Sequence, residues 1–289
     1  MCNRTLVSFD WALKNILRDK ANFDVLEGLL TALLQQEIKV ISLLESEGNQ
    51  QSESDKFNRI DIVVEDENKQ IMAIEIQNNR ETHYLERLLY GTSKIIVDHV
   101  KIGERYEKVR KVISISILYF LLGEGEDDYI YHGKTEFYGL HTRKKLELHH
   151  RKQDAITGKI ITEKKNIFPE YYLIEVERFQ DIISNDIDEW IYFLKNSEIK
   201  PNFKAKNIQQ AKEKLDLLKM EPEKRKAYEK FLMDRASEKD VIDTARVEGK
   251  EEGKEEGKIE VAKNMLAEKI DISLIAKVTG LSEDEIRKL

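Results

Sequence analysis

Two periodicities of apolar residues organise the first half of the chain. Apolar side chains recur every three or four positions through residues 9–36 and 81–102, which predicts amphipathic helices. The run 112–120 (VISISILYF) is instead apolar throughout, as in a strand buried on both faces. Helical and strand patterns therefore alternate in this region, which is typical of a mixed α/β core.

Short β-rich runs lie between the two predicted helical regions. Residues 38–44 form one, and residues 60–64 and 70–76 form two more, joined by a polar turn that predicts a β-hairpin. The polar segment 45–56 has no periodicity and is expected to be an exposed loop. Further along the chain we expect four short strands, at residues 129–132, 137–140, 146–149 and 171–176. We also expect one helix around Trp190, at residues 182–194.

The C-terminal third is highly charged and predicted to be helical. Residues 207–246 read as helix, and the sequence Glu-Gly-Lys then recurs every four residues from Glu248 to Lys258. Each glycine costs roughly 1 kcal/mol of helix stability relative to alanine, so we expect a weak helix or a hinge there. Gly280 is a helix stop, and Ser282 with Glu285 has capping-box spacing. The predicted domains are 1–200, a charged helical region 201–247, and a hinge with a small helical module 248–289.

Composition narrows the class of protein and leaves the partner open. One cysteine excludes a disulfide framework, and no apolar run is long enough for a membrane span, so we expect a cytoplasmic protein with no membrane partner. The net charge of −7 argues at first against nucleic acid. However, residues 45–67 alone carry eight acidic and two basic residues. The negative net charge therefore limits the affinity for DNA, but it does not exclude DNA as a partner.

The predicted hairpin brings polar residues of one chemical kind together. Glu75 and Gln77 are two apart on its second strand and so share a face, while Asp61 opens the first strand and can fold back beside Glu75. Two carboxylates beside an amide form an all-oxygen site suited to Mg²⁺ or its substitute Mn²⁺. Such a cation activates water and neutralises a phosphodiester during attack. The alternative is that Asp61 and Glu75 are simply solvated residues of an exposed hairpin.

Several stretches resemble one known family. Arg59-Ile60-Asp61, Glu75-Ile76-Gln77 and the residues Tyr84, Arg87 and Tyr90 resemble the recombination-promoting nuclease (Rpn) family of the PD-(D/E)XK nuclease superfamily. The opening FDWALK (residues 9–14) and the terminal IAKVTGLS (residues 275–282) are similar to the family as well. The resemblance implies a restriction-endonuclease-like α/β core, a mixed sheet flanked by helices, with an all-helical C-terminal extension.

The resemblance also implies roles for individual residues. Asp61 and Glu75 would bind the metal, and Asp10 on the first helix would complete its shell, unless Asp10 is the N-cap of that helix. Gln77 stands where the superfamily usually has lysine, and Ile60 stands where its name has proline. Glutamine can orient the attacking water but supplies no positive charge to the transition state.

Two basic segments are candidates for the DNA-binding surface. Residues 87–111 carry seven basic residues against three acidic ones, and residues 134–165 carry nine against four. Basic side chains there would clamp phosphates without reading sequence. For Arg87 and Tyr90 the alternative is an ion pair with Glu86 or another acid, plus a packed tyrosine. The candidate contacts are Arg59, Arg87, Tyr90, Lys94, Arg143, Lys144 and Lys145.

The predicted function is that of a Mg²⁺-dependent DNA endonuclease linked to recombination or transposase-like activity. Two alternatives stay open: a nuclease-fold protein that binds DNA or assembles without cutting, which Gln77 favours, and a toxin-like defence protein. The end of the chain is similar to part of a helix-turn-helix, but its last helix would begin with three acids, Glu283 to Glu285, which repel phosphate. We therefore expect the C-terminal module to mediate partner binding or a homo-oligomer.

Overall fold

The computed structural model describes residues 6–44, 60–100, 105–123, 128–153, 160–164 and 166–289. The chain divides into two units, Met1–Glu221 and Pro222–Leu289, and each is considered by itself. The acidic segment 45–56, predicted to be a loop, and the candidate DNA contact Arg59 both lie outside the described residues.

A mixed sheet forms the centre of the first unit. Within the described ranges it has six strands in the order β1–β2–β3–β4–β8–β5. The central strands β3, β4 and β8 are parallel, whereas β1, β2 and β5 join as antiparallel neighbours. The strands span Val40–Leu44 (β1), Ile62–Asp66 (β2), Ile71–Gln77 (β3), Val112–Leu118 (β4), Ile130–Lys134 (β5) and Glu170–Glu175 (β8).

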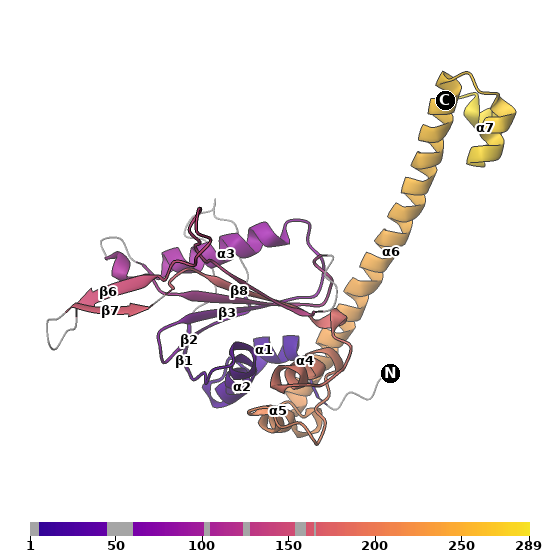
Figure 1. Cartoon of the computed structure of the whole chain (residues 1–289). Helices are drawn as coiled ribbons and strands as arrows, with labels where there is room; N and C mark the ends of the chain where they lie inside the picture. Colours follow the sequence, from indigo (N-terminus) through magenta and orange to yellow (C-terminus); the bar gives the residue numbers. More distant parts are fainter. Residues whose placement is uncertain (1–5, 45–59, 101–104, 124–127, 154–159, 165) are drawn as a thin grey trace. The chain divides into compact units, whose positions relative to one another are not determined.

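Helices cover both faces of this sheet. Figure 1 shows α3 on one face and α1, α2, α4 and α5 on the other. These helices span Phe9–Asn15 (α1), Phe23–Leu34 (α2), Tyr84–Asp98 (α3), Asp186–Asn196 (α4) and Ile208–Lys214 (α5), and short 3₁₀ turns occupy Lys20–Asn22, Tyr106–Lys108, Val176–Arg178 and Leu217–Lys219. The predicted mixed α/β core flanked by helices is confirmed, as is the hairpin of β2 and β3.

The face of the sheet under α3 changes from apolar to polar along the strands. At one end, α3 packs Ile95 against Ala73 of β3 and Val112 of β4. Further along, the register of the parallel pair places Glu75 of β3 beside Ser116 of β4. Residues in register on neighbouring strands share a face, so a carboxylate and a hydroxyl lie under the helix where apolar residues would be expected.

One predicted strand is wrong and one strand was not predicted. Residues 137–140 form no strand, because Tyr138 makes only an isolated bridge with Lys145 in a tight turn. The run predicted at 146–149 begins instead at His149, where β6 (His149–Gln153) pairs with β7 (Ile160–Lys164) in a separate two-stranded sheet. Both strands are dominated by charged and polar residues, so they lack the apolar alternation from which strands are recognised.

The second unit is wholly helical in secondary structure, as predicted. It comprises α6 (Pro222–Ala267), α7 (Ile272–Thr279) and α8 (Glu283–Ile286). The Glu-Gly-Lys repeat, for which we expected a weak helix or a hinge, lies within α6. A small core packs the end of α6 against α7 and α8 through Ala262, Ile275 and Ile286. Gly280 ends α7 in the left-handed region, and Ser282 and Glu285 form the predicted capping box.

None of the helices in the described part of the chain is long and apolar enough to span a membrane.

Candidate active site

The hairpin brings the two predicted carboxylates to adjacent backbone positions. Asp61 directly precedes β2, and its Oδ2 accepts a hydrogen bond of 2.7 Å from the backbone N–H of Ile76. Glu75 is the residue before Ile76, so this bond holds Asp61 next to Glu75. The side chains of Asp61 and Glu75 are only 11% and 10% exposed. The structure therefore brings together two nearly buried carboxylates, which are costly unless compensated.

Arg87 of α3 compensates Glu75. Its guanidinium lies 2.6 Å from Glu75 Oε1, and its Nε lies 2.9 Å from Glu81 Oε2. The same guanidinium donates to Gln77 Oε1 at 3.1 Å. Thus the alternative of an ion pair with an acid is confirmed for Arg87, although its partners are Glu75 and Glu81 rather than Glu86. The packed tyrosine of that alternative is wrong, because Tyr90 is 40% exposed.

Gln77 takes part in the same network. Its Nε2 donates to Glu81 Oε1 at 2.8 Å and to the carbonyl of Asn79 at 3.1 Å. Both ends of the Gln77 amide therefore have partners, with its oxygen bound to Arg87 and its nitrogen to the segment after β3. Its role as the residue that orients water stays a prediction. Its contacts hold Glu81 and Arg87 in place.

Two cations from the segment around α1 contact Asp61, one at its carboxylate and one at its backbone carbonyl. Lys14 Nζ lies 3.2 Å from Asp61 Oδ1, and Arg18 donates to the Asp61 backbone carbonyl at 2.9 Å. Neither Lys14 nor Arg18 was predicted to be part of the site. Lys14 lies within the FDWALK stretch that resembles the family's first helix, and that stretch was the one available signal. Arg18 had none, since its contact depends on how α1 packs beside the sheet.

Asp10, the third predicted metal ligand, lies in the first turn of α1 and is buried. The alternative that it caps this helix is wrong, because Ser8 occupies the N-cap position. No three histidine, cysteine, aspartate or glutamate side chains gather into a group that could hold a metal, as far as the described residues go. The structure therefore places Asp61 next to Glu75, but Asp10 does not join them in a group of three possible metal ligands.

The surroundings of Glu75 shift its protonation equilibrium towards the neutral form. Burial raises the pKa of Glu75 to about 7, the positive charge of Arg87 opposes this rise, and the nearby Asp61 carboxylate adds to it. A carboxyl with a pKa near neutrality, next to a second carboxylate, is a common feature of functional sites. A bound divalent cation would reverse the balance by stabilising the ionised form.

Two further polar groups near Glu75 lack good partners. Tyr84 OH and Ser116 Oγ are close enough to interact, yet both are buried and neither forms a well-aligned hydrogen bond within the described structure. Burial, and then the charge of Glu75, raise the pKa of Tyr84, which therefore stays protonated. A cavity of about 10 Å³, room for one water at most, also borders Glu75 and Arg87. Such unused hydrogen-bonding capacity is unusual in a purely structural core.

The donor set fits a hard divalent cation. Mg²⁺ is commonly held by one or two carboxylates while it keeps several waters and binds substrate phosphates. Asp61 and Glu75 supply two carboxylates of this kind at the edge of the buried region. Soft metals that need cysteine or clustered histidine find no such ligands here in the described residues.

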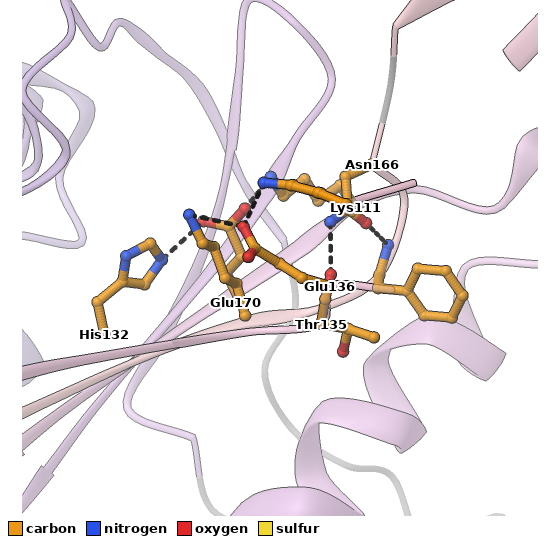
Figure 2. A network of polar contacts seen from close by, with 9 residues as sticks. Lys111, His132, Thr135, Glu136, Asn166 and Glu170 are labelled. Carbon is orange, nitrogen blue, oxygen red and sulfur yellow. Dashed lines mark hydrogen bonds and ion pairs between the residues drawn. The ribbon is translucent and has the colours of Figure 1, made fainter. Parts of the chain in front are cut away.

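The predicted DNA contacts are scattered, and besides Arg87 two more of them pair with acids. Lys94 lies 3.0 Å from Asp98 on α3, and Lys145 lies 2.5 Å from Glu136. Arg143 and Lys144 are exposed in the turn that Lys145 closes, with Arg143 at a positive φ of 56°. Figure 2 shows Glu136 near Glu170, which binds Lys111 and His132. Acids thus neutralise part of the basic segment 134–165.

Comparison with known protein families agrees with these features. A family described as PD-(D/E)XK nuclease family transposase matches residues 7–245, and the C-terminal HTH domain of the Rpn/YhgA-like nuclease family matches residues 255–289. The HTH match supports DNA as a partner of the terminal module, which we had interpreted as a module for partner binding or self-association. No curated protein and no solved structure matches the chain. The chain therefore belongs to the PD-(D/E)XK nuclease family of transposases, in its Rpn/YhgA-like branch.

Proposed function

We propose that this protein is a divalent-metal-dependent DNA endonuclease whose metal ligands are Asp61 and Glu75, with Mg²⁺ as the metal and Mn²⁺ as its substitute. One observation carries the proposal: the Asp61 carboxylate is fixed by the Ile76 N–H beside Glu75, in a chain of the PD-(D/E)XK nuclease family. Membership of this family supports a nuclease or transposase-like function. The cuts would serve DNA recombination or transposition, as the family description suggests.

The roles of the residues follow from their contacts. When bound, the metal lowers the pKa of a coordinated water and neutralises charge on the phosphodiester. Asp61 and Glu75 hold it, and the Ile76 N–H fixes the orientation of Asp61. Arg87 offsets the charge of Glu75, and Gln77 keeps Arg87 and Glu81 in position. Exposed basic residues such as Arg143 and Lys144 would contact the DNA backbone.

The test compares nicking of supercoiled plasmid by wild type, Asp61→Asn and Glu75→Gln in Mg²⁺ or Mn²⁺. Both variants keep the shape of the side chain and remove its charge. We expect each to reduce the rate on the order of 10²-fold or more. Glu37→Gln is the matched control, because Glu37 is an exposed acid that pairs with Lys206 away from the hairpin. Equal nicking by all four proteins, or by none, would refute the proposal.

A second candidate is a DNA-binding or assembly protein that does not cut. The observation that favours it is the neutralisation of both carboxylates by the chain's own cations, Lys14 and Arg87. If this candidate holds, wild type binds plasmid with an affinity that falls with salt but leaves it supercoiled in every metal.

A further inference from the structure

The carboxylate pair needs a positive charge that β3 does not provide. Gln77 is neutral, and its amide is bound to Glu81, Asn79 and Arg87. Hydrolysis of a phosphodiester builds up negative charge in the transition state, and a cation placed beside the phosphate stabilises that charge. Any side-chain cation that adds to the charge of the metal therefore has to come from another element that reaches the pair.

Two cations contact the carboxylates, and they differ in how freely they can move. Arg87 binds Glu75, Glu81 and Gln77 at once and is 25% exposed. Moving it would leave Glu75 buried without its counter-ion, which is strongly unfavourable. Lys14 contacts Asp61 Oδ1 at 3.2 Å, and its side chain is 51% exposed. Its flexible stem ends in a compact ammonium group with three donors, which suits a phosphate oxygen.

The backbone of Lys14 is anchored by the core, whereas the side chain of Lys14 is half exposed. Phe9, Ala12 and Leu13 of α1 are fully buried, so the helix is anchored by the core. One turn further on, Arg18 binds the Asp61 carbonyl at 2.9 Å. These contacts fix the distance between α1 and Asp61. The Lys14 ammonium therefore combines contact with Asp61 with access to solvent, so it can reach a phosphate bound beside this carboxylate.

We propose that Lys14 is a catalytic residue that contacts the scissile phosphodiester and supplies from α1 the positive charge that Gln77 does not supply from β3. This inference rests on the proposed nuclease function and assigns one more residue to the same site. In the free protein Lys14 pairs with Asp61. With DNA and metal bound, Asp61 would hold the metal, and the Lys14 ammonium would be released to turn to a phosphate oxygen.

The first experiment moves the lysine between elements. Plasmid nicking is measured for wild type, Lys14→Gln, Gln77→Lys and the double variant Lys14→Gln/Gln77→Lys, with Lys39→Gln as the matched control because Lys39 is exposed before β1. We expect Lys14→Gln to lower kcat on the order of 10²-fold. The double variant recovers at least tenfold of that loss, and Lys39→Gln cuts like wild type. If Lys14 only stabilised the fold, a lysine at position 77 on β3 would not restore the nicking activity.

The second experiment does not depend on cutting. Binding of a DNA duplex is measured against salt concentration in Ca²⁺, which takes oxygen ligands, while a gel verifies that the duplex stays intact. Loss of one phosphate contact reduces the slope of log K against log salt by about 0.9. We expect this decrease for Lys14→Gln and no change for Lys39→Gln.

The outcomes separate the two proposals. If wild type and Lys14→Gln cut equally, or if the salt slope of Lys14→Gln is unchanged, the role of Lys14 is refuted while the nuclease function stands. If wild type binds DNA but cuts nothing, the nuclease function fails, and the catalytic role of Lys14 fails with it. The salt slope then decides whether Lys14 still contacts phosphate. If wild type neither binds nor cuts, both proposals fall.

Discussion

The buried Glu75 predicts a specific dependence of stability on pH. Burial raises its pKa from the ordinary 4.5 to about 7 in the folded chain. Between these values the folded protein keeps a proton that the unfolded chain releases. The stabilisation of the folded state that this retained proton provides is thus fully present below pH 4.5, and it is lost as pH rises through 7. Each pKa unit corresponds to about 1.4 kcal/mol, so Glu75 should lower the free energy of unfolding by about 3 kcal/mol at high pH.

The assay compares wild type with Glu75→Gln, which cannot titrate. Urea unfolding without metal is followed at several pH values from 5 to 8 by tryptophan fluorescence. Both tryptophans of the chain, Trp11 and Trp190, are buried in the first unit, so the signal reports on the unit that holds the site. Other titrating groups are common to both proteins and cancel in the difference. A difference in unfolding free energy between the two proteins that stays constant from pH 5 to pH 8 would contradict this account of Glu75.

Three other perturbations have defined outcomes. In 10 mM Mg²⁺ the urea midpoint of wild type should rise more at pH 8 than at pH 6, because the metal competes with the Glu75 proton; Asp61→Asn should show little rise. Gly28→Ala should destabilise by about 1–3 kcal/mol in urea unfolding, since its Cβ would lie 2.4 Å from the Lys206 carbonyl and 2.6 Å from Trp190. In Gly253→Ala the added Cβ would meet nothing within 4 Å, so this substitution should stabilise α6 by about 1 kcal/mol. Circular dichroism on heating measures the effect, and an unchanged or lower melting temperature would contradict it.

The sequence was sufficient for the part of the site that is built by local geometry. Alternation along β3 placed Glu75 and Gln77 on one face, and a short turn returned the chain so that Asp61 reached the Ile76 N–H. Both inferences need only the two-residue period of a strand and the register of a hairpin. The amphipathic spacing of α3 likewise predicted a helix after β3, and the ion pair of Arg87 with an acid was one of the two alternatives for that residue.

The sequence could not identify the partners that depend on tertiary packing. Lys14 is separated from Asp61 by 47 positions, and nothing local indicates that α1 ends beside the hairpin. Glu81 falls at the start of the segment predicted to be helical, but α3 begins only at Tyr84, and Glu81 in the connection before it binds both Gln77 and Arg87. The strands β6 and β7 were missed or shifted because their sequences are mostly charged and polar and show no apolar alternation.

The arrangement of the cations explains why this site needs the whole fold. Asp61 and Glu75 are adjacent on one hairpin, but Lys14 comes from α1 and Arg87 from α3, helices on opposite faces of the sheet (Figure 1). Packing of the fold buries both carboxylates side by side, which would be unfavourable without positive charges to offset their desolvation and repulsion. The pair becomes tolerable only when both helical layers have packed. Burial, and to a smaller extent the charge of Asp61, still raise the pKa of Glu75, and a divalent cation would oppose this rise by stabilising the ionised form.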